Sequence, residues 1–193
     1  MPKRLFDLIF AGLALVVLAP VMVVVAIWVR WDSPGTVFFR QTRVGRDGKL
    51  FRIYKFRSMH ALAETSGPAI TIGADTRITR AGNWLRRTKV DELPQFINVL
   101  QGCMSIVGPR PHAVAHNETY RKLIKGYMVR HKVRPGITGW AQVNGLRGET
   151  ETLDKMKARV ECDLDYLRHW SLGLDIYIIF KTVGVVFKDQ YAY

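Results

Sequence analysis

The sequence predicts a mostly helical α+β protein, with an apolar N-terminal helix followed by a compact domain that carries a small β-hairpin. Leu8–Val29 contains no Asp, Glu, Lys or Arg, which predicts the first helix. Two short runs rich in Val, Phe, Ile and Tyr, Thr36–Arg43 and Leu50–Met59, flank a Gly-Arg-Asp-Gly turn and predict the hairpin. Apolar residues at helical spacing fill most of the remaining chain and predict amphipathic helices.

The apolar run is long enough to reach through a bilayer. About 22 helical residues at ~1.5 Å each extend ~33 Å, but Pro20 interrupts the run near its middle. Basic residues flank both ends, so both ends favour the cytoplasmic face; they are Lys3, Arg4, Arg30, Arg40 and Arg43. We therefore predict that residues 1–32 form a re-entrant helix that enters the membrane, bends at Ala19-Pro20 and returns, and that residues 33–193 form a cytoplasmic domain.

Three other interpretations of this segment remain open. Spanning helices tolerate proline, so a kinked transmembrane helix is the main alternative. A cleaved signal peptide is disfavoured because the residues near its end, Val29–Trp31, are bulky. A buried helix of a soluble protein is disfavoured because little else in the chain is apolar enough to cover it.

The overall charge indicates an anionic partner. The 193 residues have a formal net charge of +13, which favours nucleic acid, acidic lipid or phosphorylated substrates. The membrane segment favours the last two, so we expect membrane lipid and no nucleic acid as partners, and we leave a homo-oligomer open. Cys103 and Cys162 are too few for a disulfide framework or a zinc cluster, which is consistent with a reducing cytoplasm.

The middle of the chain predicts a helix that begins with two carboxylates. Asp91 can act as its N-cap, and Pro94 falls in the first turn. Leu93, Phe96, Ile97 and Leu100 form an apolar face, and Gly102 ends the helix.

Further elements follow from proline, glycine and periodicity. Gly108–Pro111 predicts a rigid extended turn, and Pro135–Gly139 predicts a second rigid loop. We expect a helical stretch around 116–131 and a long helix around 150–170. The last helix, Asp175–Phe187, has a broad apolar face that fits either the core or the plane of a membrane surface.

Asp91 and Glu92 are the strongest candidates for chemistry. They follow an arginine-rich stretch, and both the helix N-terminus and the cations should keep them ionised. Such a pair suits a hard divalent ion such as Mg²⁺, and an aspartate can also attack phosphorus as a nucleophile. The alternative is a capping Asp and a surface Glu paired with Arg86 or Arg87.

Arg110 is the candidate phosphate ligand, because the prolines on either side, Pro109 and Pro111, would pre-position its guanidinium for bidentate recognition. A basic face toward acidic lipid is the alternative. Lys55 and Arg57, at the end of the second strand, fit either role.

Four segments together resemble the bacterial sugar transferase family, the monotopic phosphoglycosyl transferases. They are Lys55-Phe56-Arg57-Ser58-Met59, Leu85–Thr88 leading into Asp91-Glu92-Leu93-Pro94-Gln95, Met104–Pro111 and Pro135–Trp140. The resemblance covers essentially the whole chain in order. Residues 111–118 and 145–152 look most like the undecaprenyl-phosphate glucose phosphotransferases within that family.

The resemblance implies a reaction. A sugar 1-phosphate, glucose 1-phosphate in the most similar group, would move from a UDP-sugar such as UDP-glucose to undecaprenyl phosphate with Mg²⁺ and release UMP. This is the first membrane step of exopolysaccharide or glycoconjugate synthesis. By position, Asp91 would be the nucleophile and Glu92 its partner near the metal, while Lys55, Arg86 and Arg110 would bind phosphate and the Pro109–Pro111 turn would lie by the nucleotide.

The resemblance also implies a location at the bacterial inner membrane, with the catalytic domain on its cytoplasmic face. Two departures from the family pattern stand out. Ala19 occupies the position where many members place Ser before the proline, and longer relatives carry additional transmembrane helices and a further domain.

A non-catalytic basic scaffold on the membrane surface and a membrane-anchored nucleic-acid-binding protein are the competing functions. The two carboxylates inside the basic region argue against both, because they would weaken a site for polyanions. No residue is an obvious reader of sugar stereochemistry.

Overall fold

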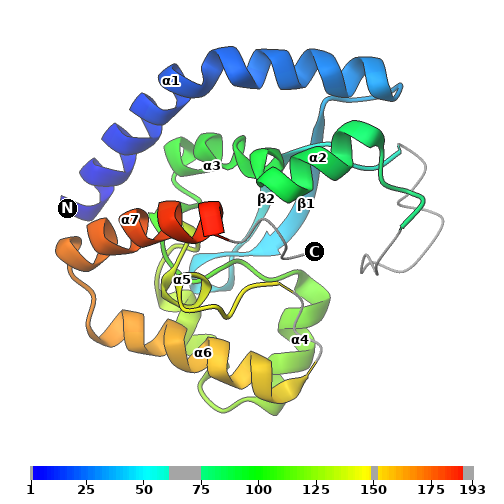
Figure 1. Ribbon diagram of the computed structural model, residues 1–193. Helices are drawn as coiled ribbons and strands as arrows, with labels where there is room; N and C mark the ends of the chain where they lie inside the picture. Colours follow the sequence, from blue (N-terminus) through cyan, green and yellow to red (C-terminus); the bar gives the residue numbers. More distant parts are fainter. Residues whose placement is uncertain (1, 61–74, 149–151, 189–193) are drawn as a thin grey trace.

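A computed structural model describes residues 2–60, 75–148 and 152–188. It confirms a mostly helical α+β protein with an apolar N-terminal helix and small sheets (Figure 1). The helices and strands in chain order are α1 (Pro2–Asp32), β1 (Phe38–Val44), β2 (Leu50–Phe56), α2 (Arg80–Thr88), α3 (Gln95–Gln101), β3 (Ser105–Val107), α4 (Val114–Leu123), β4 (Gly136–Thr138), α5 (Trp140–Val143), α6 (Leu153–Arg168) and α7 (Leu172–Lys188).

Helix α1 is continuous through Pro20 and changes direction near its middle as it arches over α3 and α2 (Figure 1). Its buried residues, Asp7, Ala11, Val25 and Val29, lie toward its two ends. Residues 12–24 are not buried, and this stretch includes exposed Leu13, Val16, Val17, Val23 and Val24. Both ends of the helix therefore pack into the core, whereas its apolar middle is at most partly buried.

Strands β1 and β2 form the predicted antiparallel hairpin, with Phe39 paired to Lys55 and Arg43 paired to Phe51. Directly opposed residues share a face, so Arg43 and Lys55 project on the same side as buried Ile53. Arg40 and its partner Tyr54 project on the other side, where the guanidinium carbon of Arg40 lies 5.0 Å from the Tyr54 ring centroid.

The structure contains a second sheet, which the sequence did not reveal: β4 lies within the expected loop Pro135–Gly139, and β3 directly precedes the expected turn Gly108–Pro111. β3 and β4 pair in parallel, and Gly136 at the start of β4 packs closely against Gly108, which follows β3. A Cβ on Gly136 would lie 2.1 Å from the Gly108 nitrogen, so only glycine fits there. This close approach holds the chain that follows β3 in a fixed position.

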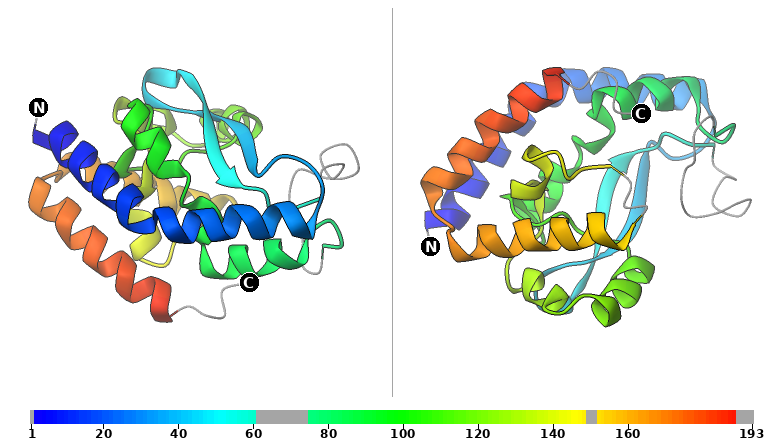
Figure 2. Two further views of the ribbon diagram at one scale, coloured as in Figure 1. Left: turned by 90° about the horizontal axis from the view of Figure 1, so that it is seen from above. Right: turned by 60° about the horizontal axis from the view of Figure 1, so that its bottom comes forward.

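The main core joins elements from both halves of the chain. Its buried members come from α1, β2, α3, β3, the residue before β3, α5, α6 and α7, and they are Ala11, Ile53, Val99, Met104, Ile106, Val107, Val143, Tyr166 and Ile178. A smaller cluster of Val25, Val29, Phe56 and Leu85 fixes the second half of α1 on β2 and α2. Figure 2 shows α1 and α7 on one side of the molecule and α6 and α4 on the other.

Three expectations need correction. The helix expected to start at Asp91 begins at Gln95, because Val90–Glu92 forms a separate 3₁₀ turn in which Asp91 caps nothing. The basic stretch before it contains an unforeseen helix, α2, whose Thr79 N-cap accepts a hydrogen bond from the Gly82 nitrogen. The helical stretch expected over 116–131 is divided at Gly126, which adopts a left-handed conformation (φ 80°), into α4 and a 3₁₀ helix, Tyr127–Lys132.

Candidate active site

The carboxylate pair lies between α2 and α3, where the backbone makes a sharp reversal. Lys89 ends α2 with φ at +60°, a left-handed conformation that is uncommon for a residue with a side chain. The 3₁₀ turn that follows carries Asp91 and Glu92 toward β2. Strained backbone of this kind is often found at functional sites.

Glu92 is held by two cations from distant parts of the chain. The Lys55 Nζ lies 2.6 Å from Glu92 Oε1, and Arg110 donates to Oε1 at 2.6 Å and to Oε2 at 3.2 Å. Burial alone would raise the pKa of Glu92, but Arg110 and Lys55 hold this pKa well below its usual range. Glu92 is therefore ionised at neutral pH, as expected, and it joins β2 to the turn after β3.

Asp91 has a different environment. Its side chain is 10% exposed, and its nearest cation is the Lys55 Nζ, 3.9 Å from Oδ2. Within the described part of the chain its carboxylate accepts no hydrogen bond. Burial raises the pKa of Asp91 to about 6, against the opposing effect of Lys55 and with a further increase from Glu92. The expectation that both carboxylates would be fully ionised is thus too simple, because burial opposes the charge on Asp91.

The turn that carries Arg110 is held at each of its three carbonyl groups. The Gly136 nitrogen donates to the Pro109 carbonyl at 3.0 Å, and Arg130 Nη2 donates to the Arg110 carbonyl at 2.8 Å. Arg43 Nη1 lies 3.5 Å from the Pro111 carbonyl. Pro109 and Pro111 are buried. They therefore contribute to the site by supporting the backbone that carries Arg110.

Arg130 is held in turn by a buried carboxylate on α6. Its Nε donates to Asp163 Oδ2 at 2.9 Å and its Nη1 to His112 Nδ1 at 2.8 Å, and the Arg130 and Asp163 side chains are 1% and 3% exposed. Burial and neighbouring Arg130 keep the pKa of His112 well below its usual range, so His112 is a neutral acceptor. Sequence reasoning missed this pair. The available signal was a charge at 163 on the same helical face as Met156 and Val160.

Two candidate phosphate ligands lie differently from Arg110. Arg57 donates to the carbonyls of Pro34 (2.7 Å), Val29 (3.3 Å) and Ser33, so its guanidinium holds the C-terminal end of α1 and is not directed at the carboxylates. Arg86 lies in the last turn of α2 and is one of the cations that lower the pKa of Asp91. The structure thus brings Lys55, Arg110, Asp91 and Glu92 together directly, with Arg86 nearby.

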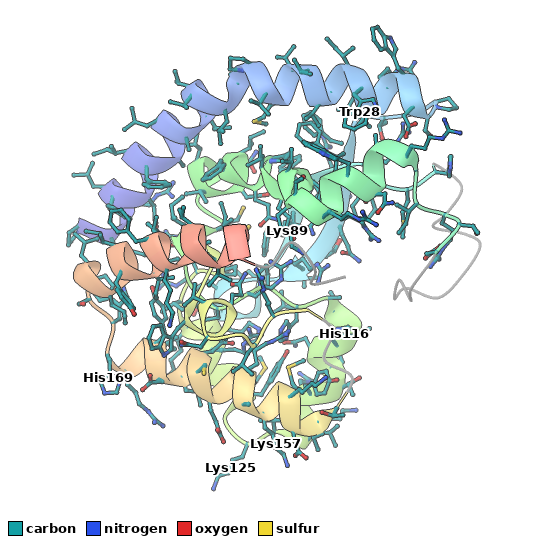
Figure 3. The ribbon with its side chains drawn as sticks, viewed as in Figure 1. Trp28, Lys89, His116, Lys125, Lys157 and His169 are labelled. Carbon is teal, nitrogen blue, oxygen red and sulfur yellow. The ribbon has the colours of Figure 1, made fainter. Side chains whose placement is uncertain are left out.

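The site can do two things chemically. The paired Lys55–Glu92–Arg110 group presents fixed positive charge, which suits the oxygens of a transferring phosphoryl group. Asp91 presents a carboxylate that is not already bound, which suits a nucleophile or a metal ligand. Figure 3 labels Lys89, which precedes this turn, near the middle of the view, with His169 and Lys125 at the edge of the view.

Comparison with known proteins gives a consistent result. The family model described as "Bacterial sugar transferase" matches residues 1–189. The "UDP-glucose:undecaprenyl-phosphate glucose-1-phosphate transferase" of Escherichia coli (strain K12) is 58% identical over 191 residues, which is 99% of this chain and 41% of the relative.

Two other relatives show the range of similarity. The "Exopolysaccharide production protein PSS" of Rhizobium leguminosarum bv. phaseoli is 50% identical over 94% of this chain and 92% of its own length. The "UDP-N-acetylgalactosamine-undecaprenyl-phosphate N-acetylgalactosaminephosphotransferase" of Aeromonas hydrophila is 42% identical over 95% of this chain and 43% of the relative. The chain therefore spans about two-fifths of the E. coli and A. hydrophila relatives and nearly all of PSS.

Proposed function

Because the chain belongs to the bacterial sugar transferase family, we propose that it transfers a sugar 1-phosphate from a UDP-sugar to undecaprenyl phosphate and releases UMP. One observation carries this proposal. The largely buried carboxylate of Asp91 accepts no hydrogen bond among the described residues and lies beside Lys55 and Arg110, the two cations that Glu92 holds in place. We take glucose as the sugar because the E. coli relative is named for it. The reaction would be the first membrane step of exopolysaccharide or glycoconjugate synthesis.

In the proposed mechanism Asp91 acts as the nucleophile. One carboxylate oxygen attacks the sugar-bearing phosphorus of the UDP-sugar, and the bond from that phosphorus to the bridging oxygen breaks, so UMP leaves with the electron pair. An oxygen of undecaprenyl phosphate then attacks the same phosphorus and displaces the Asp91 carboxylate. Splitting the transfer in two lets one site handle a soluble nucleotide and a lipid in turn.

The cations would stabilise the transition state in both steps. Lys55 and Arg110 are already ordered by Glu92, so little reorganisation is needed when charge develops on the phosphoryl oxygens. Glu92 would act as a positioning residue for both cations, and Arg86 would add a longer-range positive field.

Mg²⁺ is proposed as the cofactor, and the residues present fit it in part. Mg²⁺ often binds through one or two carboxylates and completes its shell with substrate phosphates and water. Asp91 can supply one such carboxylate, whereas both oxygens of Glu92 are engaged by Lys55 and Arg110. No cluster of three His, Cys, Asp or Glu occurs among the described residues. We therefore propose Asp91 as the primary ligand of an ion that would neutralise phosphate charge.

We also propose that α1 is re-entrant, with the domain 33–193 on the cytoplasmic face of the inner membrane. α1 is the one described helix long and apolar enough to cross a membrane, a criterion that core helices and signal sequences also meet. Polar contacts at both ends support the re-entrant arrangement: Arg4 donates to the Val99 carbonyl at 2.6 Å, and Asp32 accepts from the Ala81 nitrogen at 2.9 Å. A straight spanning helix would carry one of these ends away from the domain.

Helix α7 supports the same membrane placement. Ile178 is fully buried, whereas Tyr177 and Phe180 are 53% and 73% exposed. The helix thus has one face in the core, and we propose that its exposed apolar face rests on a membrane surface.

Purified full-length chain in detergent, given Mg²⁺ and a panel of UDP-sugars, tests the function. We expect UMP release with undecaprenyl phosphate present. Without the lipid we expect up to about one equivalent of UMP and a hexose-phosphate adduct on Asp91 after fast quenching, and neither in Asp91→Asn. Absence of UMP with every sugar would refute the proposed reaction. UMP that appears only with both substrates, without adduct, would refute the two-step mechanism alone.

A further inference from the structure

Arg43 lies at the same turn as Arg110, although the sequence places it among the basic residues that flank the membrane helix. Its Nη1 is 3.5 Å from the Pro111 carbonyl, and the Val44 nitrogen that follows it donates to the His112 carbonyl at 3.2 Å. The hairpin register places Arg43 on the same face as Lys55. One face of the hairpin therefore projects two cations toward the Glu92–Arg110 pair.

The guanidinium of Arg43 is partly buried without an anionic partner. It binds two neutral groups, the Pro111 carbonyl and the Gln41 side-chain oxygen, and its Nε is buried with no acceptor. No carboxylate of the described residues forms a salt bridge with it. Burial and the nearby charge of Arg110 lower the pKa of Arg43 to about 10, against the opposing effect of Glu92, so burying its charge costs free energy.

The two other arginines that hold this turn have carboxylate partners, whereas Arg43 has neutral ones. Arg130 is compensated by Asp163, and Arg110 by Glu92. A partly buried guanidinium left with neutral partners beside a second guanidinium forms a site for an anion with several oxygens, such as a phosphate.

The hairpin also indicates which part of a substrate Arg43 could reach. Arg43 is four residues along β1 from the partner of Lys55, a distance of about 13 Å between backbone positions. Asp91 lies at the Lys55 end, so a reacting phosphorus beside Asp91 would leave the adjacent phosphate, that of the departing nucleotide, nearer to Arg43.

We propose that Arg43 is a further substrate-binding residue, which with Arg110 forms a two-arginine site for a substrate phosphate, by this geometry the nucleotide phosphate of the UDP-sugar. The inference rests on the proposed function for the identity of the substrate. It goes beyond that function because it assigns a phosphate ligand to β1, a strand with no other proposed role in the reaction.

The experiment uses full-length Arg43→Gln and Arg43→Lys in detergent, with Arg40→Gln as the matched control. Arg40 is on the same strand but on the opposite face, where it stacks on Tyr54. The binding of UDP is measured by calorimetry, KM is measured separately for UDP-sugar and for undecaprenyl phosphate, and Tm is recorded for each variant. If Arg43→Gln does not fold, Arg43→Lys provides the comparison, because it keeps the charge and loses the planar fork.

We expect Arg43→Gln to weaken UDP binding by roughly tenfold or more, about 1.4 kcal/mol, with Arg43→Lys intermediate and Arg40→Gln unchanged at an equal Tm. A rise in the KM for undecaprenyl phosphate with UDP binding intact would assign the same phosphate site to the lipid substrate. If the Arg43 variants match Arg40→Gln in both measurements while the wild-type chain turns over, Arg43 is structural and the inference fails, although the proposed function stands. Wild-type chain that binds UDP through Arg43 without turnover would support the inference and refute the function.

Discussion

Arg110 and Glu92 form a planar, two-point ion pair, and this geometry gives the first prediction. Replacing Arg110 by Lys keeps the charge but loses the second donor that now reaches Glu92 Oε2 at 3.2 Å. We expect kcat/KM to fall at least roughly tenfold, about 1.4 kcal/mol of transition-state stabilisation. Arg121→Lys, in an exposed pair with Glu118, is the control and should leave kcat/KM unchanged. Near-normal kcat/KM in Arg110→Lys would show that Arg110 serves the fold or the membrane surface.

Asp91 should make the reaction sensitive to acid. Its pKa is raised to about 6, and only the ionised carboxylate can attack phosphorus. The single-turnover rate of UMP release should therefore fall as pH drops through about 6, and a bound Mg²⁺ should move the midpoint lower because it favours the charged form. A rate that does not fall in acid at any Mg²⁺ concentration tested would contradict an ionisable nucleophile with a raised pKa.

The same carboxyl should also cost stability at neutral pH. The folded-state pKa lies above the ordinary value of 3.8, so between 3.8 and about 6 the folded state binds more protons than the unfolded state. Stability from this group is present below pH 3.8 and is lost as pH rises through 6. We expect Asp91→Asn to raise Tm at pH 7.5 by a few degrees, on the order of 2–4 °C per kcal/mol, and to have a smaller effect near pH 4. A lower Tm in Asp91→Asn at pH 7.5 would contradict the raised pKa.

At the scale of elements, α1 offers a topological prediction. Both ends contact the same domain, so cysteines placed at Pro2 and Thr36, in a chain whose Cys103 and Cys162 are replaced by Ala, should react alike with an impermeant reagent. Neither should be labelled in intact cells, and both should be labelled after lysis. Labelling of one alone in intact cells would support a spanning helix. Pro20→Leu should shift some molecules toward that pattern, because a straight apolar run of this length can cross a bilayer.

The close approach of Gly136 in β4 to Gly108, which follows β3, gives a second prediction at this scale. A methyl group at Gly136 would meet the Gly108 nitrogen at 2.1 Å and the Gly108 oxygen at 2.6 Å. Gly136→Ala should therefore displace the Arg110 turn and destabilise the fold by several kcal/mol, seen as a large drop in Tm. Gly184→Ala, in α7, is the control, since its added methyl meets nothing within 4 Å and should be neutral or slightly stabilising. Equal Tm values for the two variants would show that the contact between Gly136 and Gly108 tolerates a side chain.

Local patterns predicted the hairpin and several helices but not the contacts that assemble the site. The hairpin and the end of α3 at Gly102 followed from turn chemistry and periodicity, because these are decided by neighbouring residues. The helix start at Asp91 was wrong because Lys89 adopts a left-handed conformation, which tertiary contacts decide. The β3–β4 pair was missed because three-residue strands leave too short a pattern.

The site shows the same division. Asp91, Glu92, Lys55 and Arg110 were predicted because their residue types and motifs point to phosphate chemistry, and the structure brings them together. Arg43, Arg130 and Asp163 were not, because each acts through a contact between distant parts of the chain; Arg130 and Asp163, for example, are 33 residues apart. Arg57 was expected to bind substrate because it shares a segment with Lys55, but it follows the end of β2 at Phe56, and its guanidinium donates to the backbone carbonyls at the C-terminal end of α1.

At the scale of the whole molecule, a buried charge network joins α1 to the domain. Lys3 Nζ lies 3.3 Å from Asp7 Oδ1 and 2.7 Å from Asp175 Oδ2, and both carboxylates are fully buried. Asp7 also accepts from the Ser105 hydroxyl at 3.0 Å and the Ile106 nitrogen at 3.1 Å, which fixes α1 on β3. Asp175 accepts from the Tyr166 hydroxyl at 2.7 Å and from Trp170 Nε1 at 3.2 Å, which ties in α6 and the start of α7.

Removing Lys3 should therefore unfold much more than the N-terminal turn. Lys3→Met leaves two buried carboxylates without a cation, and breaking a buried ion pair in this way typically costs about 3–5 kcal/mol. We expect a drop in Tm on the order of 10 °C for a chain of this size. Lys157→Met, which breaks an exposed pair with Asp154, is the control and should change Tm by a degree or two at most.

A compensated variant separates the charge effect from simple loss of packing. In Lys3→Met/Asp7→Asn/Asp175→Asn the uncompensated charges are gone, so a substantial part of the lost Tm should return even though three native side chains are absent. UMP release measured on the same proteins then reports whether α1 positions β3 and the Arg110 turn that follows it. Activity should fall in Lys3→Met before the global unfolding transition is reached. If Lys3→Met keeps a wild-type Tm, the network does not join α1 to the domain, and the core residues Ala11, Val25 and Val29 must hold the helix by themselves.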